Sequence, residues 1–571
     1  MPHPNTLPFA ELKEALADCR QHFIYAGTFS AAVNILMLTP IIYMMAVYDR
    51  VVASGSLSTL AMLTLLMVAL LLASGGFEWV RAQILIVASN RMEANLRKRV
   101  SDATFKRALL TGGMVKDSQP RNDLNSLRQF LTGSGLFAFF DAPWFPIYLA
   151  IMFMFHVWFG IIGLVGGILM VILAIAQEKL TNTAMQEANT EANKVSAQFQ
   201  SGLRNAEVVA GMGMADAIRR RQENSEQKVI TLQISSSRKA AMLSAITKSA
   251  RLIMQSLALG LGAYLALRQE ISPGMMIAGS LLLGRALAPI DMLVGSWKGF
   301  SVARAQYQRL GELLDAIPKD EKRMSLPAPN GQIRIEQVTI VPPGSRIMAV
   351  KGVSFDLDAG ETLGIVGPSA SGKSSLARAI LGIWPAYAGK VRLDGADISS
   401  WDRNELGPHV GYLPQDIELF DGTIADNICR FQDADESKIV EAAVLAGVHE
   451  MILRLPSGYD TIIGGSGGVL SGGQRQRVGL ARAAYGSPKL ILLDEPNSNL
   501  DDQGERELVE AIKRIKSLGT TVILITHRTM VLQCVDKILL MKEGVAASFG
   551  PKDQVLASLA APTSAPKSAA R

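Results

Sequence analysis

The sequence predicts a multidomain membrane protein: an all-α domain of six transmembrane helices, followed by an α/β domain. Uncharged apolar runs long enough to cross a bilayer occur throughout the first half of the chain. From Gly331 onward, short β-rich runs alternate with helical stretches, which is typical of an α/β domain. The mean hydropathy of +0.23, with 49% apolar and 19% charged residues, is high for a soluble protein.

Six spans account for the apolar runs. Residues 23–48 and 57–77 form a hairpin, because the turn between them is too short to hold a domain. The uncharged stretch 142–177 is too long for one helix and, with the residues just before it, holds two spans that turn near His156–Gly160. Residues 252–267 and 271–295 supply the last pair. Asp141, Arg285 and Asp291 fall near or within spans, where ionisable groups usually pair or line a polar path.

The basic residues indicate the topology. They gather between spans two and three, as in Arg97-Lys98-Arg99, and between spans four and five, as in Arg219-Arg220-Arg221. By the positive-inside tendency, both connections and both termini face the cytoplasm. Both connections are expected to continue the membrane helices well beyond the bilayer.

The predicted domain boundaries follow from these changes of composition. Residues 1–22 form a cytoplasmic segment, 23–300 the membrane domain, 301–330 a linker, 331–558 the α/β domain and 559–571 a disordered tail rich in Ala, Ser and Pro. We expect no removable signal peptide, because residues 1–22 lack a basic start and a small-residue cleavage site.

Two classes of function are disfavoured by composition. The three cysteines, Cys19, Cys429 and Cys534, are far apart and without C-x-x-C spacing, so neither a disulfide framework nor a zinc site is indicated. The net charge of +6 is explained by the basic residues that flank the spans, so we expect no nucleic-acid partner.

A phosphate-binding motif opens the α/β domain. The motif G-x-x-x-x-G-K-[ST] follows the apolar run 362–366 and precedes a helix-forming run, which is the context it requires. Its glycines let backbone N–H groups approach phosphate oxygens, Lys373 neutralises phosphate charge, and the Ser374 hydroxyl can bind Mg²⁺. The predicted ATP-binding residues here are Gly367, Pro368, Ser369, Ala370, Ser371, Gly372, Lys373, Ser374 and Ser375.

A second apolar run, 490–493, ends in Asp494 and Glu495, as a buried parallel strand does when it delivers carboxylates to a nucleotide site. Asp494 suits the coordination of Mg²⁺. Glu495 is placed to orient, or accept a proton from, an attacking water.

Leu470-Ser471-Gly472-Gly473-Gln474 resembles the signature sequence of ABC ATPases, since it lies between the phosphate-binding motif and the Asp-Glu strand. Its glycines precede a helical run, so its N–H groups form another anion-binding helix start. The resemblance implies that Ser471, Gly472, Gly473 and Gln474 complete the ATP site of a second copy, and hence a homodimer.

The other ABC motifs follow in order. Gln415 resembles the Q-loop residue. The resemblance implies that Gln415 is catalytic and that it binds Mg²⁺ together with Ser374 and Asp494. Asp501 resembles the D-loop acid, and His527 resembles the switch histidine, which the resemblance makes catalytic. Two features depart from the family: residues 338–343 offer no aromatic for stacking on adenine, and residues 463–467 lack the acidic residue that many exporters carry there.

Nearly the whole chain, from about residue 20 to residue 555, resembles the ATPases of type I secretion systems, specifically the PrtD-like exporters of proteases and RTX proteins. The narrower marks are residues 141–150, 204–214 and 297–300, with Arg304 and Tyr307. The resemblance implies an ATP-driven exporter in the bacterial inner membrane, surrounded by lipid, that translocates an unfolded polypeptide with an uncleaved C-terminal signal. It also implies a periplasmic membrane-fusion adaptor and an outer-membrane channel as partners. Because only about 22 residues precede the first span, we expect no leader peptidase activity; a lipid or drug exporter is the alternative.

Overall fold

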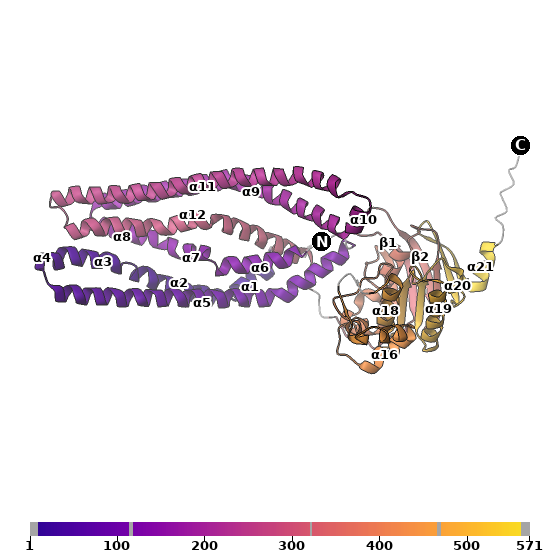
Figure 1. Ribbon diagram of the computed structural model, residues 1–571. Helices are drawn as coiled ribbons and strands as arrows, with labels where there is room; N and C mark the ends of the chain where they lie inside the picture. Colours follow the sequence, from indigo (N-terminus) through magenta and orange to yellow (C-terminus); the bar gives the residue numbers. More distant parts are fainter. Residues whose placement is uncertain (1–8, 113–117, 320–322, 465–469, 561–571) are drawn as a thin grey trace. The chain divides into compact units, whose positions relative to one another are not determined.

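The computed structural model describes residues 9–112, 118–319, 323–464 and 470–560 (Figure 1). The chain divides into two units. Unit 1 comprises Met1–Phe105 and Asp117–Lys319, and unit 2 comprises Lys106–Lys116 and Asp320–Arg571.

Unit 1 is built from helices throughout its described residues. Several of them are much longer than a bilayer requires. In chain order the helices are α1 (Ala10–Ala17), α2 (Arg20–Leu36), α3 (Thr39–Ala46), α4 (Val52–Ser54), α5 (Leu57–Leu110, which ends in unit 2), α6 (Gln119–Thr132), α7 (Ser134–Asp141), α8 (Phe145–Phe155), α9 (Val157–Arg204), α10 (Ala206–Gly211), α11 (Ala215–Leu267) and α12 (Pro273–Ala316).

The predicted count of six spans is confirmed among the described residues. The segments long and apolar enough to cross a membrane are Arg20–Ser54, Leu57–Leu110, Gly135–Phe155, Val157–Leu180, Ala215–Leu267 and Pro273–Trp297. Helices α5, α9 and α11 contain 54, 48 and 53 residues. At 1.5 Å per residue each is about 70 to 80 Å long, against a hydrocarbon core of about 30 Å. These helices therefore extend well beyond the bilayer, as the sequence predicted.

Two spans are interrupted. The first was predicted as one run, but it consists of α2, α3, a five-residue π-helix (Val47–Val51) and α4. The break before α3 coincides with Pro40, which has no N–H to continue the helical ladder. In the third span, a 3-10 turn (Ala142–Trp144) separates α7 from α8 at the segment that contains Pro143 and Pro146.

Residues 301–316, predicted as the start of a linker, continue α12. The segment contains no proline, and its one glycine, Gly311, lies within the helix, where a single glycine is tolerated.

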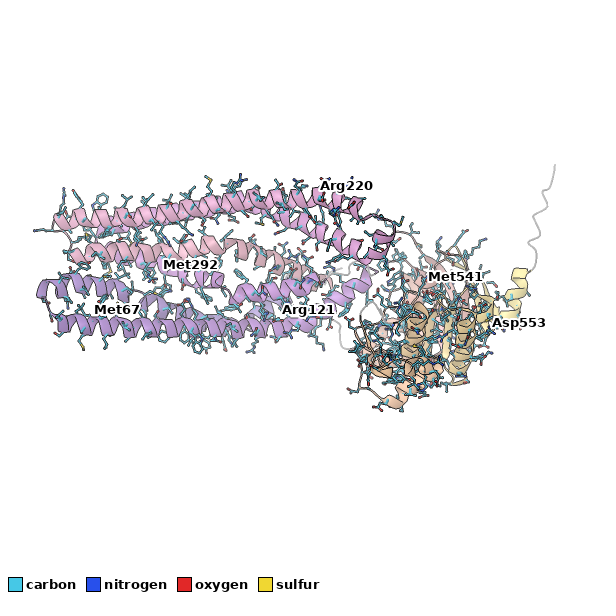
Figure 2. The ribbon with its side chains drawn as sticks, viewed as in Figure 1. Met67, Arg121, Arg220, Met292, Met541 and Asp553 are labelled. Atoms are coloured by element: carbon cyan, nitrogen blue, oxygen red, sulfur yellow. The ribbon has the colours of Figure 1, made fainter. Side chains whose placement is uncertain are left out.

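Helix α5 presents a broad apolar surface to its surroundings. Leu57, Met62, Leu65 and Leu72 are each at least 69% exposed within the protomer, and the side chains of this helix can be followed in Figure 2 from Met67. Exposed apolar surface of this extent is typical of contact with lipid or with another membrane helix.

Two of the three ionisable residues predicted near or within the spans, Asp141 and Asp291, pair with arginines. Arg81 donates hydrogen bonds to Asp141 Oδ1 at 3.0 Å and to Ser30 Oγ at 2.8 Å, and Asn34 Nδ2 donates to the same Asp141 oxygen at 2.8 Å. This buried polar cluster connects α2, α5 and α7. Farther along, Arg251 on α11 donates to an Asp291 oxygen on α12 at 2.9 Å. Burying charge in this way is tolerated only when the groups are paired.

Unit 2 contains two larger sheets. A four-stranded antiparallel sheet has the order β2-β1-β4-β5, and a six-stranded sheet has the order β12-β11-β3-β10-β9-β6, in which only β12 runs antiparallel to its neighbour. The strands are β1 (Ile333–Ile340), β2 (Val350–Leu357), β3 (Thr362–Val366), β4 (Ala388–Leu393), β5 (Ala396–Asp397), β6 (Val410–Leu413), β7 (Gly422–Thr423), β8 (Ile462–Ile463), β9 (Leu490–Asp494), β10 (Thr521–Ile525), β11 (Lys537–Lys542) and β12 (Val545–Pro551).

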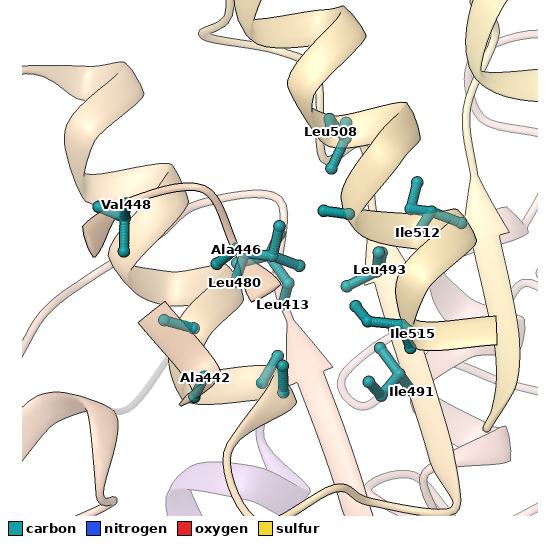
Figure 3. Close-up of a cluster of buried hydrophobic side chains, with 14 of the residues drawn as sticks. Leu413, Ala442, Ala446, Val448, Leu480, Ile491, Leu493, Leu508, Ile512 and Ile515 are labelled. Atoms are coloured by element: carbon teal, nitrogen blue, oxygen red, sulfur yellow. The ribbon is translucent and has the colours of Figure 1, made fainter. Parts of the chain in front are cut away.

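Besides the end of α5, the described residues of unit 2 form a series of shorter α-helices. They are α13 (Lys373–Ile380), α14 (Arg403–Leu406), α15 (Ile424–Ile428), α16 (Glu436–Leu445), α17 (His449–Leu453), α18 (Gly472–Ala484), α19 (Asp502–Ser517), α20 (Thr529–Leu532) and α21 (Lys552–Ala560). Figure 3 shows part of the core, in which Leu413 and Leu493 of the sheet face Leu480 of α18 and Ile512 of α19. The central strands β9 and β10 are buried along their whole length, as expected of parallel strands covered on both faces.

All three cysteines are free and buried. Cys19 and Cys429 are each 1% exposed and Cys534 is 8% exposed. Burial raises the pKa of the Cys534 thiol above its ordinary value.

Candidate functional site

The predicted site residues meet at one edge of the parallel sheet. Strand β10 pairs in parallel with both β3 and β9, so that Ile525 lies beside Ile365 on one side and beside Asp494 on the other. The chain leaves all three strands at the same edge. The carboxyl ends of parallel strands are where open α/β sheets bind ligands.

The phosphate-binding motif forms a turn between β3 and α13. Gly372 is the N-cap of α13 with φ 94°, and a Cβ there would lie 2.2 Å from the carbonyl oxygen of Ala349. Only glycine fits this close approach with this backbone conformation. Lys373, Ser374 and Ser375 follow as the first turn of α13, where free N–H groups favour an anion.

Lys373 contacts its own loop. Its ammonium donates hydrogen bonds to the carbonyl oxygens of Gly367 at 2.8 Å and Pro368 at 2.9 Å. The remaining loop residues complete the turn: Pro368, Ser369 and Ala370 are exposed, and Ala370 adopts a left-handed φ of 63°. Ser371 is buried, and its hydroxyl has no hydrogen-bond partner. The loop therefore holds cationic and hydroxyl groups around one turn.

Asp494 is a buried carboxylate at the end of β9. It is 3% exposed, and its Oδ1 atom has no hydrogen-bond partner. Burial is the main cause that raises the pKa of Asp494, and the neighbouring Glu495 raises it further, whereas a hydrogen bond with Ser374 and the positive charges of Arg378 and Lys373 act in the opposite direction. Asp494 and Ser374, predicted as partners at a metal site, therefore lie side by side.

Three further predicted residues, Gln415, Glu495 and His527, come together beyond Asp494. Gln415, two residues after β6, donates from Nε2 to Glu495 Oε2 at 2.9 Å. His527, two residues after β10, has its Nδ1 4.0 Å from Glu495 Oε1. Glu495 itself has a left-handed φ of 51°, and its N–H donates to the carbonyl of Ile525. A non-glycine residue held in this conformation is common at functional sites.

The signature residues begin α18. Ser471 is the N-cap and forms a capping box with Gln474: the Ser471 N–H donates to Gln474 Oε1 at 2.8 Å, and the Gln474 N–H donates to Ser471 Oγ at 3.3 Å. Ser471 is exposed and Gln474 is half-buried, and Gly472 and Gly473 lie between them in the first turn. This helix start is thus a second surface that favours an anion.

Asp501 is the N-cap of α19. Its carboxylate accepts a hydrogen bond from the N–H of Gly504 at 2.8 Å. The structure therefore assigns this side chain a local capping contact within its own chain.

Sequence reasoning missed two residues that hold the site in place. Gln476 of α18 is 2% exposed, donates to the carbonyl of Glu495 at 3.4 Å and accepts from the N–H of Asn499 at 3.1 Å. Thr526 is fully buried, and its hydroxyl donates to Asn497 Oδ1 and accepts from the N–H of Arg528. Thr526 and Arg528 are the two chain neighbours of His527, so these hydrogen bonds hold the backbone on both sides of the histidine. The sequence signal that could have indicated a buried role for Gln476 is its position as a polar residue on an otherwise apolar face of the helix.

The two departures noted in the sequence have different outcomes. Residues 338–343 form the end of β1 and the turn after it, and no aromatic residue is among them. Of residues 463–467, Gly465, Ser466 and Gly467 lie outside the residues that the structure describes.

The arrangement suits hydrolysis of a phosphoanhydride. A cationic loop at a helix start can hold phosphates, and a buried carboxylate beside a hydroxyl can hold a divalent cation. A glutamate that accepts a hydrogen bond from an amide and has an imidazole nearby can orient water.

Comparisons with known proteins agree with this chemistry. Residues 350–498 match the family model described as ABC transporter, and residues 23–288 match the model described as ABC transporter transmembrane region. The type I secretion system ATP-binding protein PrsD of Rhizobium meliloti is 45% identical over 97% of this chain and 95% of its own length. The cyclolysin secretion/processing ATP-binding protein CyaB of Bordetella pertussis is 30% identical over 92% of this chain and 74% of its own length.

The fold also matches a solved structure of a bacterial Atm1-family ABC exporter with ATP bound. The TM-score is 0.81 at 23% sequence identity, over 96% of this chain and 99% of that one. The predicted two-part fold, six apolar helices before an ATPase domain, is thereby confirmed. This chain is thus a multi-pass membrane protein that couples ATP binding and hydrolysis to export, and it belongs to the family of type I secretion system ATP-binding proteins.

Proposed function

We propose that this protein energises a type I secretion system by exporting an unfolded polypeptide that carries an uncleaved C-terminal signal. The observation that carries this proposal is the 45% identity to PrsD over nearly the full length of both chains. More distant relatives are named for the translocation of cyclolysin, leukotoxin and toxin RTX-I, which are polypeptides. Such a cargo requires a membrane-fusion adaptor and an outer-membrane channel as partners.

The proposed location is the bacterial inner membrane, with the ATPase domain and both termini in the cytoplasm. Basic residues concentrated between spans two and three and between spans four and five support this orientation. The same segments form the extensions of α5, α9 and α11 beyond the bilayer.

The phosphate-binding loop is proposed to hold ATP through the residues from Gly367 to Ser375. Lys373 would move its ammonium from the loop carbonyls to the phosphates, exchanging two hydrogen bonds to neutral acceptors for contacts with anions. Mg²⁺ would be held by Ser374, Gln415 and Asp494, and the unpartnered, buried Asp494 Oδ1 fits such an ion. When bound, Mg²⁺ supplies charge neutralisation to the transferring phosphate.

Glu495, Gln415 and His527 are the proposed catalytic residues. The Glu495 carboxylate orients the attacking water and can accept its proton. Gln415 and His527 approach different oxygens of that carboxylate, so that both restrict its orientation. His527 can also donate a hydrogen bond to the phosphate that is released.

Two copies of the chain are proposed to share each nucleotide. Ser471, Gly472, Gly473 and Gln474 of one copy would face the ATP held by the other, because the exposed start of α18 offers N–H groups to an anion. Asp501 is proposed to lie at the same interface, beside its capping contact in α19.

The test is ATPase activity of the purified protein in lipid vesicles, with and without C-terminal peptides of secreted proteins encoded beside it. We expect a saturable increase or decrease with the cognate peptide and none with a scrambled peptide of the same composition. Glu495→Gln should bind ATP normally and lose nearly all turnover, whereas Lys373→Ala should lose binding. No response to peptides, together with stimulation by lipids or hydrophobic drugs, would instead identify a lipid or drug exporter.

A further inference from the structure

Arg430 follows α15 and uses its whole guanidinium group inside unit 2. Nε donates to the carbonyl of Arg482 at 3.0 Å, Nη1 to those of Gly407 at 2.8 Å and Val410 at 3.1 Å, and Nη2 to those of Ala483 at 3.1 Å and Tyr485 at 3.4 Å. A guanidinium has five N–H groups, so each is matched by one acceptor. All five acceptors are backbone carbonyls, so the contact depends on backbone position.

The five carbonyls belong to two elements that carry predicted site residues at their other ends. Three are at the C-terminal end of α18, the helix that begins at the signature Ser471. The other two are at Gly407 and Val410, where the chain enters β6 and runs on to Gln415. The last carbonyls of a helix have no intrahelical partner and carry partial negative charge, which suits a cation. Arg430 therefore joins the signature helix to the strand that leads to Gln415.

A second arginine joins α18 to the segment after Gln415. Arg482 donates from Nη1 to the carbonyl of Glu418 at 3.3 Å, and its guanidinium lies 5.6 Å from the centre of the Phe420 ring. Phe420 in turn meets the ring of Phe431 edge to face, at 5.9 Å between centroids. The segment around Gln415 is thus held to α18 on both sides.

Glycines bring the two elements into direct contact. A Cβ at Gly411 of β6 would lie 2.1 Å from the carbonyl oxygen of Ala483, and a Cβ at Gly479 of α18 would lie 2.9 Å from Leu413 and 3.1 Å from Ile417. Backbones this close cannot slide past each other without a clash.

The backbone at Arg430 also has an unusual conformation. Arg430 and Phe431 have φ of 61° and 57°, two consecutive non-glycine residues in the left-handed region. Such residues persist only where the surroundings hold them. Here the turn lets the Arg430 side chain reach α18 and β6 while the Phe431 ring meets Phe420.

We propose that Arg430 is a positioning residue for ATP turnover: it locks α18 to β6, so that Ser471 and Gln415 move as one rigid piece. This inference rests on the proposed sharing of each nucleotide between two copies. While Arg430 connects α18 to β6, a displacement of Gln415 at one nucleotide also displaces Ser471, which faces the other nucleotide. Without this connection, ATP still binds to the phosphate-binding loop, but the signature does not reach the position in which turnover occurs.

The test compares Arg430→Ala with Arg403→Ala. Arg403 is a matched control, since it also donates from a partly buried guanidinium to two backbone carbonyls, of Leu381 and Gly382, and neither carbonyl belongs to α18. ATPase kinetics, binding of a fluorescent ATP analogue in the Glu495→Gln background, and unfolding temperature are measured for each full-length protein. For Arg430→Ala we expect kcat to fall about tenfold or more while the analogue Kd stays within about twofold of the parent.

The control decides what a loss means. Arg403→Ala should lower the unfolding temperature comparably but keep kcat within about threefold of wild type. If the two variants lose kcat equally, or if Arg430→Ala weakens analogue binding as much as turnover, Arg430 is only a packing residue and the proposal is wrong.

A conservative variant covers the case in which Arg430→Ala does not fold. Lysine keeps the charge but has three donors on one nitrogen, so Arg430→Lys cannot span both sets of carbonyls. We expect an intermediate kcat at unchanged analogue affinity, and wild-type kcat would overturn the proposal. These measurements use basal ATPase without peptide, so a failed response to secreted peptides would count against the proposed cargo and not against Arg430.

Discussion

The buried cluster around Asp141 gives the sharpest test of what holds the membrane unit together. We consider Arg81→Met, Asp141→Asn and the double variant. Arg81 and Asp141 are 3% and 8% exposed, so neither charge can be compensated by water when its partner is removed.

The structure predicts that the two single variants differ. In Arg81→Met, the Asp141 carboxylate keeps the hydrogen bond from Asn34 and loses its cation, and removing one partner of a buried pair typically costs about 3–5 kcal/mol. In Asp141→Asn, Arg81 keeps a second anion, the Glu78 carboxylate at 3.8 Å, as well as the Ser30 hydroxyl and the Phe137 ring at 4.3 Å, so only about 1–3 kcal/mol is expected. In the double variant the costs should not add, leaving a coupling of about 2 kcal/mol.

The assay is thermal unfolding of the purified protein in detergent, followed by tryptophan fluorescence. Arg81→Met should lower the unfolding temperature of unit 1 by about 10 °C, and Asp141→Asn by clearly less. Arg219→Met is the control, because Arg219 pairs with Asp216 on an exposed helix face and such pairs contribute about 0–1 kcal/mol. Strictly additive losses, or equal losses in the two single variants, would refute the reasoning.

Three further variants test other contacts. Gly411→Ala should lower the unfolding temperature of unit 2 by several degrees, because the new Cβ would lie 2.1 Å from the Ala483 carbonyl oxygen. The control Gly407→Ala should be nearly neutral, because no atom lies within 4 Å of the new Cβ. Equal effects of the two variants by calorimetry would contradict this. Asp49→Ala should destabilise unit 1 by about 1–2 kcal/mol in denaturant unfolding, since the carboxylate accepts hydrogen bonds from Ser272 and from the N–H of Gly274 at the start of α12; an unchanged midpoint would contradict it. Asp494→Asn should raise the unfolding temperature without nucleotide and abolish ATP turnover. Because burial raises the pKa of Asp494, the folded state favours the protonated acid, and the stability of the wild-type protein should fall as pH rises from about 4. The difference in unfolding temperature between Asp494→Asn and wild type should therefore grow over the same pH range. A difference that does not depend on pH would refute this.

Much of the fold could be predicted because its signals are local. An uncharged run of about 20 residues indicates a span by itself, and the turn at His156 between α8 and α9 follows from the length of the run that contains it. The phosphate-binding motif is equally local, since Gly372 must be glycine for reasons within a few residues of its own turn and the Ala349 carbonyl beside it.

What the sequence could not predict depends on partners that are distant in the chain. Asp141 pairs with Arg81, 60 positions earlier, and nothing near either residue indicates which charge it meets. Arg430 contacts carbonyls 20 or more positions before it and more than 50 positions after it, so its role emerges only when α18 and β6 are seen side by side. Backbone carbonyls have no sequence signature, because every residue carries one.

The sequestered thiols have a practical consequence for following export. Cys19, Cys429 and Cys534 are buried, and a buried thiol with a raised pKa, as at Cys534, reacts slowly with alkylating reagents. A single cysteine introduced at an exposed position outside the spans, for example in place of Met324, which is 83% exposed, would therefore be labelled selectively in the otherwise natural chain. Spectroscopic probes and crosslinkers could then report on translocation without first removing the native cysteines, and the folded protein would retain its own packing at all three positions.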